Sequence, residues 1–222
     1  MKDIRLIILD CDGVLVDSEP IAARVAAEVM SDLGFTVTAE EMISRYAGLS
    51  ADTVTQALEE LYNMKAPPNV NELRRRKIME AFVKELRPIS GVAQALEQVD
   101  LAKCVASSSH PERLALTLRI TRLAPLFGTN VFSSTMVARG KPAPDLFLYA
   151  AQRMMFPPAV CVVIEDSAAG VTAAKAADMH VFGFCGGSHC RAGHAERLIA
   201  SGAHGVFERM ADLPQLIGKH GS

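Results

Sequence analysis

The sequence predicts an α/β protein built on a doubly wound parallel sheet, with an all-helical insert near the N-terminus. From residue 88 onward short apolar runs alternate with helical patterns, which is typical of a parallel sheet covered by helices on both faces. Residues 19–86 show helical patterns with no strand between them. A chain of 222 residues is long enough for a large core plus such an insert. We place the core at residues 1–17 and 88–222 and the insert at residues 18–87.

Composition and charge exclude several classes of protein. Half of the residues are hydrophobic, which excludes a largely disordered chain. The formal net charge of -2 creates no global field that would favour nucleic acid or an anionic membrane. No apolar run reaches the roughly 18 residues that a membrane span requires, and no signal peptide precedes the first strand. We therefore expect a cytoplasmic monomer that has neither nucleic-acid nor membrane partners.

The first predicted strand is the apolar run Ile4–Leu9, which is typical of a buried parallel strand. Asp10 follows it directly, and Asp12 lies two residues further on, so in an extended chain both side chains would leave the same side. Gly13 then allows the backbone to turn and to approach a ligand closely. Two acids this near repel each other, so we expect a cation or a shared proton beside them.

Four helices are expected in the insert. Apolar side chains recurring every four residues predict a first helix that ends near Gly34. A capping box at Thr38–Glu41 opens a second helix, and Ser50–Thr53 opens a third. The fourth covers about residues 71–86 and carries the basic run Arg74–Lys77. We therefore expect a small helical unit that is inserted after the first strand.

Reactive polar groups follow four of the predicted strands. They are Asp10 with Asp12, Ser107 with Ser108, Lys141, and Glu165 with Asp166. Because the carboxyl ends of parallel strands lie on one edge of a sheet, these side chains can converge there. Carboxylates suit a hard cation such as Mg²⁺, and lysine and serine donors suit phosphate oxygens. Taken singly each has a simpler interpretation, such as a helix N-cap for the serines, but together they favour a phosphate site.

In their order along the chain these segments resemble the four motifs of the haloacid dehalogenase superfamily. The motifs are Asp10–Ser18, Ser107, Gly140–Pro142 and Glu165–Ser167. The resemblance spans the whole chain, and it implies a Rossmann-like core with a small helical cap of the C1 type. Within the superfamily the chain is similar to the subgroup of β-phosphoglucomutase and sugar-phosphate phosphatases, including the 6-phosphogluconate phosphatase type.

The resemblance implies a phosphoric monoester hydrolase that forms an aspartyl phosphate. Asp10 would be the nucleophile that attacks phosphorus. Asp12 would protonate the leaving alcohol and then deprotonate the water that releases phosphate. Mg²⁺ would be held by Asp10, the backbone carbonyl of Asp12, Asp166 and Glu165.

The same resemblance implies a set of phosphate-binding groups. Ser107 and Lys141 would hold the phosphoryl oxygens, and Lys141 would also offset the charge of the nucleophile. Backbone N–H groups near Gly13 and Ser108 could add donors. Lys77 falls where the mutase subgroup has a cap lysine that faces the site, although a solvated basic helix face is an equally good interpretation.

Departures from the mutase pattern bear on the choice of reaction. Ala22 stands where the mutase has a histidine, and Ala51 stands where its cap loop has an arginine for a second phosphate. Without that arginine a bisphosphate intermediate would be held poorly, which favours transfer of the phosphoryl group to water and hence a phosphatase over a mutase. The segment Gly48–Ser50 resembles the specificity loop of the cap. A dehalogenase is disfavoured, because those enzymes need no metal and lack the second aspartate of the first motif.

The sequence therefore favours a phosphatase that acts on a sugar or sugar-acid phosphate. Two alternatives remain: a sugar-phosphate mutase, and a signalling module in which the aspartyl phosphate persists. One segment, the loop Gly186–Gly193, has no clear role. It contains Cys190 with His189 and lies beside Cys185 and His194, but the pattern lacks two ligand pairs at zinc-finger spacing, so we do not expect a metal there.

Overall fold

The computed structural model describes residues 4–46 and 50–218, and these fall into two compact units. The sheet unit comprises the described residues within Met1–Asp17 and Arg87–Ser222, and the helical unit comprises those within Ser18–Leu86. The boundary after the insert lies one residue earlier than we placed it from the sequence. Arg87 belongs to the sheet unit, where its carbonyl accepts a hydrogen bond of 3.1 Å from the Asp17 N–H.

The sheet unit is built on six parallel strands in the order β3-β2-β1-β4-β5-β6. Their bounds are β1 (Leu6–Leu9), β2 (Ala102–Ser107), β3 (Val131–Ser133), β4 (Cys161–Glu165), β5 (His180–Phe184) and β6 (Gly205–Phe207). The order reverses beside β1, because the chain adds strands first on one side of it and then on the other. The doubly wound parallel sheet predicted from the sequence is therefore confirmed.

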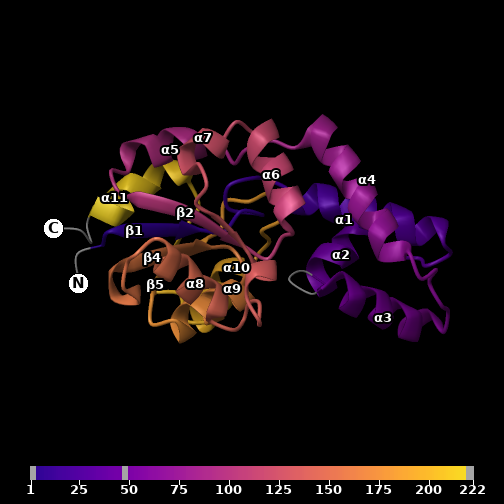
Figure 1. The fold of residues 1–222 in the computed structure, drawn as a ribbon. Helices are drawn as coiled ribbons and strands as arrows, with labels where there is room; N and C mark the ends of the chain where they lie inside the picture. The colour runs from indigo at the N-terminus through magenta and orange to yellow at the C-terminus, as the bar shows by residue number, and fades with distance from the viewer. Residues whose placement is uncertain (1–3, 47–49, 219–222) are drawn as a thin grey trace. The chain divides into compact units, whose positions relative to one another are not determined.

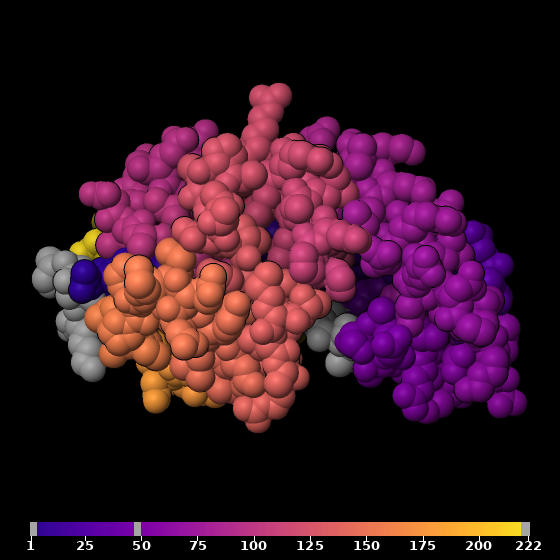
Figure 2. All heavy atoms as spheres, viewed as in Figure 1, coloured from indigo at the N-terminus to yellow at the C-terminus, as the bar shows by residue number. Residues whose placement is uncertain are grey.

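Strand β1 lies in the centre of the sheet and organises it. It pairs with β2 through Leu6–Ala102 and with β4 through Leu6–Cys161, so both of its edges are occupied. All four of its side chains, Leu6–Leu9, are fully buried, because helices cover both faces of the sheet. In the space-filling view, later segments of the chain form most of the visible surface of this unit (Figure 2).

Helices cover both faces of this sheet, with α5 and α11 on one side and α8, α9 and α10 on the other (Figure 1). The α-helices of the unit are α5 (Val92–Gln98), α6 (Pro111–Ile120), α7 (Ala124–Phe127), α8 (Asp145–Arg153), α9 (Ala168–Ala176), α10 (His194–Ala200) and α11 (Leu213–Gly218). Short 3₁₀ turns lie at η1 (Ser134–Met136), η2 (Pro158–Val160) and η3 (Met210–Asp212). Alternation along β1 sends Leu6 and Ile8 to one face, where they join a core cluster with Phe147 of α8 and Val171 of α9.

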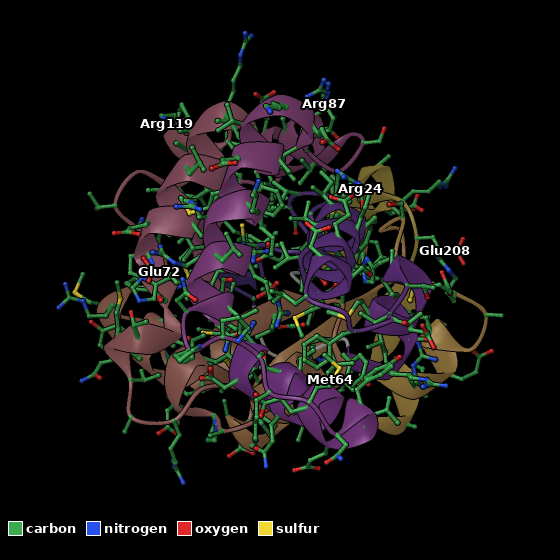
Figure 3. All side chains as sticks on the ribbon, turned by 90° about the vertical axis from the view of Figure 1, so that its right-hand side faces the viewer. Arg24, Met64, Glu72, Arg87, Arg119 and Glu208 are labelled. Atoms are coloured by element: carbon green, nitrogen blue, oxygen red, sulfur yellow. The ribbon has the colours of Figure 1, made fainter. Side chains whose placement is uncertain are left out.

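The helical unit consists of α1 (Glu19–Asp32), α2 (Ala39–Tyr46), α3 (Ala51–Tyr62) and α4 (Val70–Glu85). Its core brings Met30, Phe35 and Leu58 together. On the surface, Arg24 of α1, labelled in Figure 3, pairs with Glu28 at 2.9 Å and with Glu85 of α4 at 2.7 Å. No helix in the described part of the chain is both long enough and apolar enough to cross a membrane.

The two helix starts for which the sequence predicted a cap, those of α2 and α3, have side-chain caps. Thr38 and Glu41 exchange hydrogen bonds in a capping box, with distances of 3.0 and 3.1 Å. The Ser50 hydroxyl accepts a bond of 3.1 Å from the Thr53 N–H and so caps α3. Gly48 and Leu49, which we interpreted as part of a specificity loop, lie outside the described residues.

The packing of α8 against the sheet makes a testable prediction about stability. Phe147 is fully buried, whereas its neighbour Leu148 is 40% exposed. We expect Phe147→Ala to lower the free energy of unfolding by about 3–5 kcal/mol, because it removes buried contacts and leaves a cavity. Leu148→Ala is the matched control, with an expected change within about 0.5 kcal/mol. Urea denaturation of both variants measures the difference, and equal losses would contradict the assigned core.

Candidate active site

The site begins where β1 ends. Asp10 is the first residue after the strand, and its N–H donates to the carbonyl of Ile164 on β4 at 3.0 Å, which continues the pairing of the sheet by one residue. The Asp10 carboxylate is buried, and its Oδ1 lies 2.6 Å from Nζ of Lys141. The polar groups predicted to converge at the carboxyl edge of the sheet therefore do so for these two residues, which are 131 positions apart.

Lys141 is the buried cation of the site. It lies in the segment before α8, where the Lys141–Pro142 bond is cis, and its side chain is 5% exposed. Its Nζ donates to Asp10, to Glu165 and, at 3.0 Å, to the carbonyl of Ala106 on β2. Burial lowers the pKa of Lys141, but the charges of Asp10 and Glu165 outweigh burial, and the pKa is raised. The lysine is therefore charged while it joins the ends of three neighbouring strands.

Glu165, the last residue of β4, is fully buried and holds this lysine in place. One carboxylate oxygen contacts Lys141, and the other accepts bonds of 2.9 Å from both the N–H and the hydroxyl of Ser167. Ser167 also caps α9 by accepting from the Gly170 N–H at 3.1 Å. A Cβ at Gly170 would overlap the Glu165 carboxylate, so the helix can approach this closely only with glycine there.

Asp166 follows Glu165 and faces different neighbours. Its Oδ2 lies 3.0 Å from Nε2 of His189, and it sits against Gly13, where a Cβ would overlap the carboxylate. Burial raises the pKa of Asp166, against the hydrogen bond from His189. Burial also lowers the pKa of His189, but Asp166 and Cys190 together outweigh burial and raise that pKa to about 10. The close approach to Gly13 brings the first and the last predicted motif together.

The Asp10 carboxyl carries the consequence of this crowding. Burial raises its pKa most strongly, Lys141 opposes that effect, and the charges of Glu165, Asp166 and Asp12 raise it further. The net pKa lies well above the usual range for an aspartate. Negative charge is therefore in excess at this edge of the sheet, and the groups that could hold a cation there are the carboxylates of Asp10, Asp166 and Glu165.

Asp12 has its own set of partners. Its carboxylate accepts from the Ser109 hydroxyl at 2.6 Å and from Arg113 of α6 at 2.6 Å. Our statement that the side chains of Asp10 and Asp12 leave the same side assumed an extended chain, but β1 ends at Leu9. Gly13 then turns the backbone with φ +80°, and its N–H donates to the Val16 carbonyl at 2.8 Å. The two aspartates are thus held by different donors.

The remaining predicted residues differ in placement. Ser107 ends β2, is buried, and accepts a bond of 3.1 Å from the Ser109 N–H. Ser108 is exposed, and its carbonyl accepts from the Ser134 hydroxyl at 3.0 Å. Lys77 lies on α4 of the helical unit, where its side chain is exposed, so the geometry of the sheet unit does not test it and it stays a prediction.

Sequence reasoning missed the residues that position the predicted ones. The residue type of Arg113 gave no signal, because a single arginine in the first turn of an amphipathic helix is usually solvated. Its position shortly after the serine run that ends a strand was the hint that the sequence offered. Ser109 and Ser167 were read only as members of a serine run and a motif. His189 was assigned no role from the sequence; in the structure it is buried and contacts the Asp166 carboxylate.

Comparison with known proteins agrees with this geometry. The model of the haloacid dehalogenase-like hydrolase family matches residues 4–178. The chain is 27% identical to 6-phosphogluconate phosphatase of Escherichia coli (strain K12) over 217 residues, which is 97% of this chain and 96% of the relative. It is 32% identical to hexitol phosphatase B of the same organism over 187 residues, which is 80% of this chain and 82% of the relative.

A solved structure extends the likeness to the whole fold. A haloacid dehalogenase-like protein of unknown function from Agrobacterium tumefaciens str. C58 has a TM-score of 0.90 and 35% identity, and the match covers 99% of this chain and 100% of that one. The family match and the named relatives thus define a hydrolase, as predicted from the sequence. The chain belongs to the haloacid dehalogenase-like hydrolase family, and the resemblance carried by the four motifs is confirmed.

The pairing of Lys141 predicts a pH-dependent loss of stability. In Lys141→Met the carboxylates of Asp10 and Glu165 lose their cation and remain buried, so we expect the free energy of unfolding to fall by about 3–5 kcal/mol near pH 7. A buried acid whose native pKa is raised binds a proton in the folded state that the unfolded state lacks, so the loss should shrink as the pH falls toward about 4.

Urea denaturation at pH 7 and pH 5 measures this effect. Lys175→Met, on exposed α9 surface of the same unit, is the control and should change stability by less than about 0.5 kcal/mol at both values. A loss in Lys141→Met that is the same at both pH values would contradict the assigned charge pairing.

Proposed function

We propose that this protein is a Mg²⁺-dependent phosphatase that hydrolyses a sugar or sugar-acid phosphate through an aspartyl phosphate on Asp10. One observation carries the proposal: a buried carboxylate at the end of the central strand meets a buried lysine at 2.6 Å, while a second aspartate two residues on is held by other donors. The names of the relatives, a 6-phosphogluconate phosphatase and a hexitol phosphatase, support the substrate class.

The acidic edge of the sheet suits a divalent cation. Three buried carboxylates, those of Asp10, Glu165 and Asp166, contact one lysine and one histidine. Negative charge is therefore left in excess in a site that little water reaches. The Asp166 carboxylate lies directly against Gly13, in the position that a Cβ would take, so the backbone of the first motif is close to this acid. Oxygen ligands of this kind are those that Mg²⁺ prefers.

We assign the cation to Asp10, Asp166 and the carbonyl of Asp12. Glu165 also belongs to this set, but Ser167 holds one of its oxygens and Lys141 contacts the other, so its main task is to position the lysine. When bound, the ion offsets the repulsion between the nucleophile and a phosphate dianion and polarises a phosphoryl oxygen.

The protein groups divide the reaction between them. Asp10 attacks phosphorus, and the bond to the leaving oxygen breaks as Asp12 gives that oxygen a proton. Asp12 then takes a proton from water, the water attacks the aspartyl phosphate, and inorganic phosphate leaves with Asp10 restored. Lys141 and the hydroxyl of Ser107 bind phosphoryl oxygens during both steps.

The partners of Asp12 set a condition on its proposed task of moving protons. Ser109 and Arg113 each hold one of its carboxylate oxygens at 2.6 Å, so the side chain has a defined resting position. To protonate a leaving oxygen, Asp12 must exchange at least one of these bonds for a bond to the substrate. Different surroundings for two nearby acids allow them to carry different protonation states.

Replacement of the nucleophile gives the first test. We expect Asp10→Asn to release no phosphate above background in a screen of sugar and sugar-acid phosphates with Mg²⁺, because a carboxamide does not form the acyl phosphate. The exposed Asp100→Asn is the matched control and should retain full activity. Activity that survives in Asp10→Asn would refute the mechanism, and isomer formation without phosphate release in the unaltered protein would favour a mutase.

Replacement of the proton donor gives the second test. We expect Asp12→Asn to lower kcat about 10²–10⁴-fold, which is the usual contribution of general acid–base catalysis. The loss of kcat/KM, which reports only the step that forms the aspartyl phosphate, should be smaller for a substrate with an activated leaving group such as p-nitrophenyl phosphate, because that alcohol departs without protonation. An equal loss of kcat/KM for both substrates would show that Asp12 does not protonate the leaving oxygen.

A further inference from the structure

We infer that His189, Cys190 and His194 form a second cation site, distinct from the Mg²⁺ site, that selects a thiolate-binding ion such as Zn²⁺ and shares Asp166 with the proposed catalytic edge. The three side chains come from the loop after β5 and from the start of α10. One ligand atom from each lies within 4.8 Å of the others. We did not expect a metal here from the sequence, because the spacing is unlike that of a zinc finger.

The distance between sulfur and nitrogen is the one that such a site needs. Cys190 Sγ lies 3.6 Å from His189 Nε2. In a tetrahedral zinc site, bonds of about 2.3 Å to sulfur and about 2.0–2.1 Å to nitrogen place these two ligand atoms about 3.6 Å apart. The side chains therefore already have the separation at which one ion would contact both.

His189 is held rigidly in a narrow cradle. It is 7% exposed, and its ring packs against Gly13 and Gly187, where an added Cβ would come within 2.9 and 2.7 Å of the ring. Its Nε2 faces both Cys190 and the Asp166 carboxylate. Among the described residues its Nδ1 has no hydrogen-bond partner, so the ring owes its orientation to packing and to the groups around Nε2.

His194 presents the tautomer that a ligand requires. Its Nε2 lies 2.8 Å from the Asp166 carbonyl, which only accepts, so Nε2 carries the hydrogen and Nδ1 keeps a lone pair. Such an N–H to a carbonyl commonly orients a histidine that ligates a metal. The lone pair now accepts from Arg197 at 3.1 Å, and this exposed arginine can withdraw into solvent.

The loop that carries these ligands is tied at several points. The Ser188 N–H donates to the Asp17 carboxylate at 3.0 Å, and the Cys190 N–H donates to the Gly187 carbonyl at 3.0 Å. Arg191 donates to the Ser188 carbonyl at 2.7 Å. These bonds fix the loop before any ion arrives, so little conformational entropy is lost when a metal binds.

Ligand chemistry separates the two ions. Thiolate and imidazole select Zn²⁺ over Mg²⁺, whereas carboxylate and carbonyl oxygens suit Mg²⁺. When Zn²⁺ binds, the Cys190 thiol gives its proton to solvent and a sulfur–metal bond forms. Asp166 Oδ2, 3.0 Å from His189 Nε2, completes the tetrahedron, and this removes the carboxylate from the catalytic edge. Occupancy of the second site therefore opposes binding of Mg²⁺.

A titration of the full chain with Co²⁺ tests the site without any assay of activity. We expect a near-ultraviolet absorption band typical of thiolate-bound Co²⁺, which Zn²⁺ displaces. The band should vanish in Cys190→Ser, with affinity for Zn²⁺ reduced more than about 100-fold, beyond the loss that follows from altering a partner of a ligand. Cys185→Ser, at a partly buried cysteine after β5, is the matched control and should keep the band. Far-ultraviolet circular dichroism confirms that each variant is folded.

Two further variants sharpen the result. His194→Gln should also lose the band, which guards against a folding defect specific to Cys190→Ser. Asp166→Asn should keep the band but weaken Zn²⁺ binding about 10-fold, because it alters the shared ligand alone. Zn²⁺ binding that is unchanged in Cys190→Ser, or a band that survives in it, would overturn the site. Binding unchanged in Asp166→Asn would overturn the sharing of Asp166. None of these outcomes depends on the phosphatase proposal.

Discussion

The buried contact of Lys141 with Asp10 and Glu165 is the interaction on which the rest of the site depends. Two carboxylates at the ends of adjacent strands would repel each other in a site that water does not reach, and burying them without a partner would cost free energy. One lysine offsets both charges, and it donates a third hydrogen bond to the carbonyl of Ala106, which lies on β2. The carboxyl ends of β1, β2 and β4 are thereby joined through a single ammonium group.

Alternation along the chain assigns opposite tasks to two consecutive acids. Glu165 turns toward Lys141 and is held by Ser167, whereas Asp166 turns toward Gly13 and His189. The first contact stabilises the lysine, and the second leaves a carboxylate at the mouth of the loop after β5. A pair of neighbouring residues therefore links the proposed catalytic edge to the proposed second cation site.

The same logic separates the two aspartates of the first motif. Asp10 lies in a crowded acidic environment that raises its pKa, and its partner is buried Lys141. Asp12 lies past the turn at Gly13 and meets Ser109 and Arg113 instead. Because the surroundings of their carboxylates differ, two acids that are two positions apart can take different tasks, and a nucleophile and a proton donor can coexist within a few residues.

Periodicity in the sequence alone determined the parallel sheet and its helices, because the spacing of apolar residues within each segment indicates whether it is a strand or a helix and which of its sides is buried. The order of the motifs also indicated that Asp10, Lys141 and Glu165 meet, because the carboxyl ends of parallel strands share an edge. Only the tertiary structure decided that Arg113 reaches Asp12 and that His189 reaches Asp166. These contacts join residues far apart in the chain, and they depend on side-chain packing that local pattern does not encode.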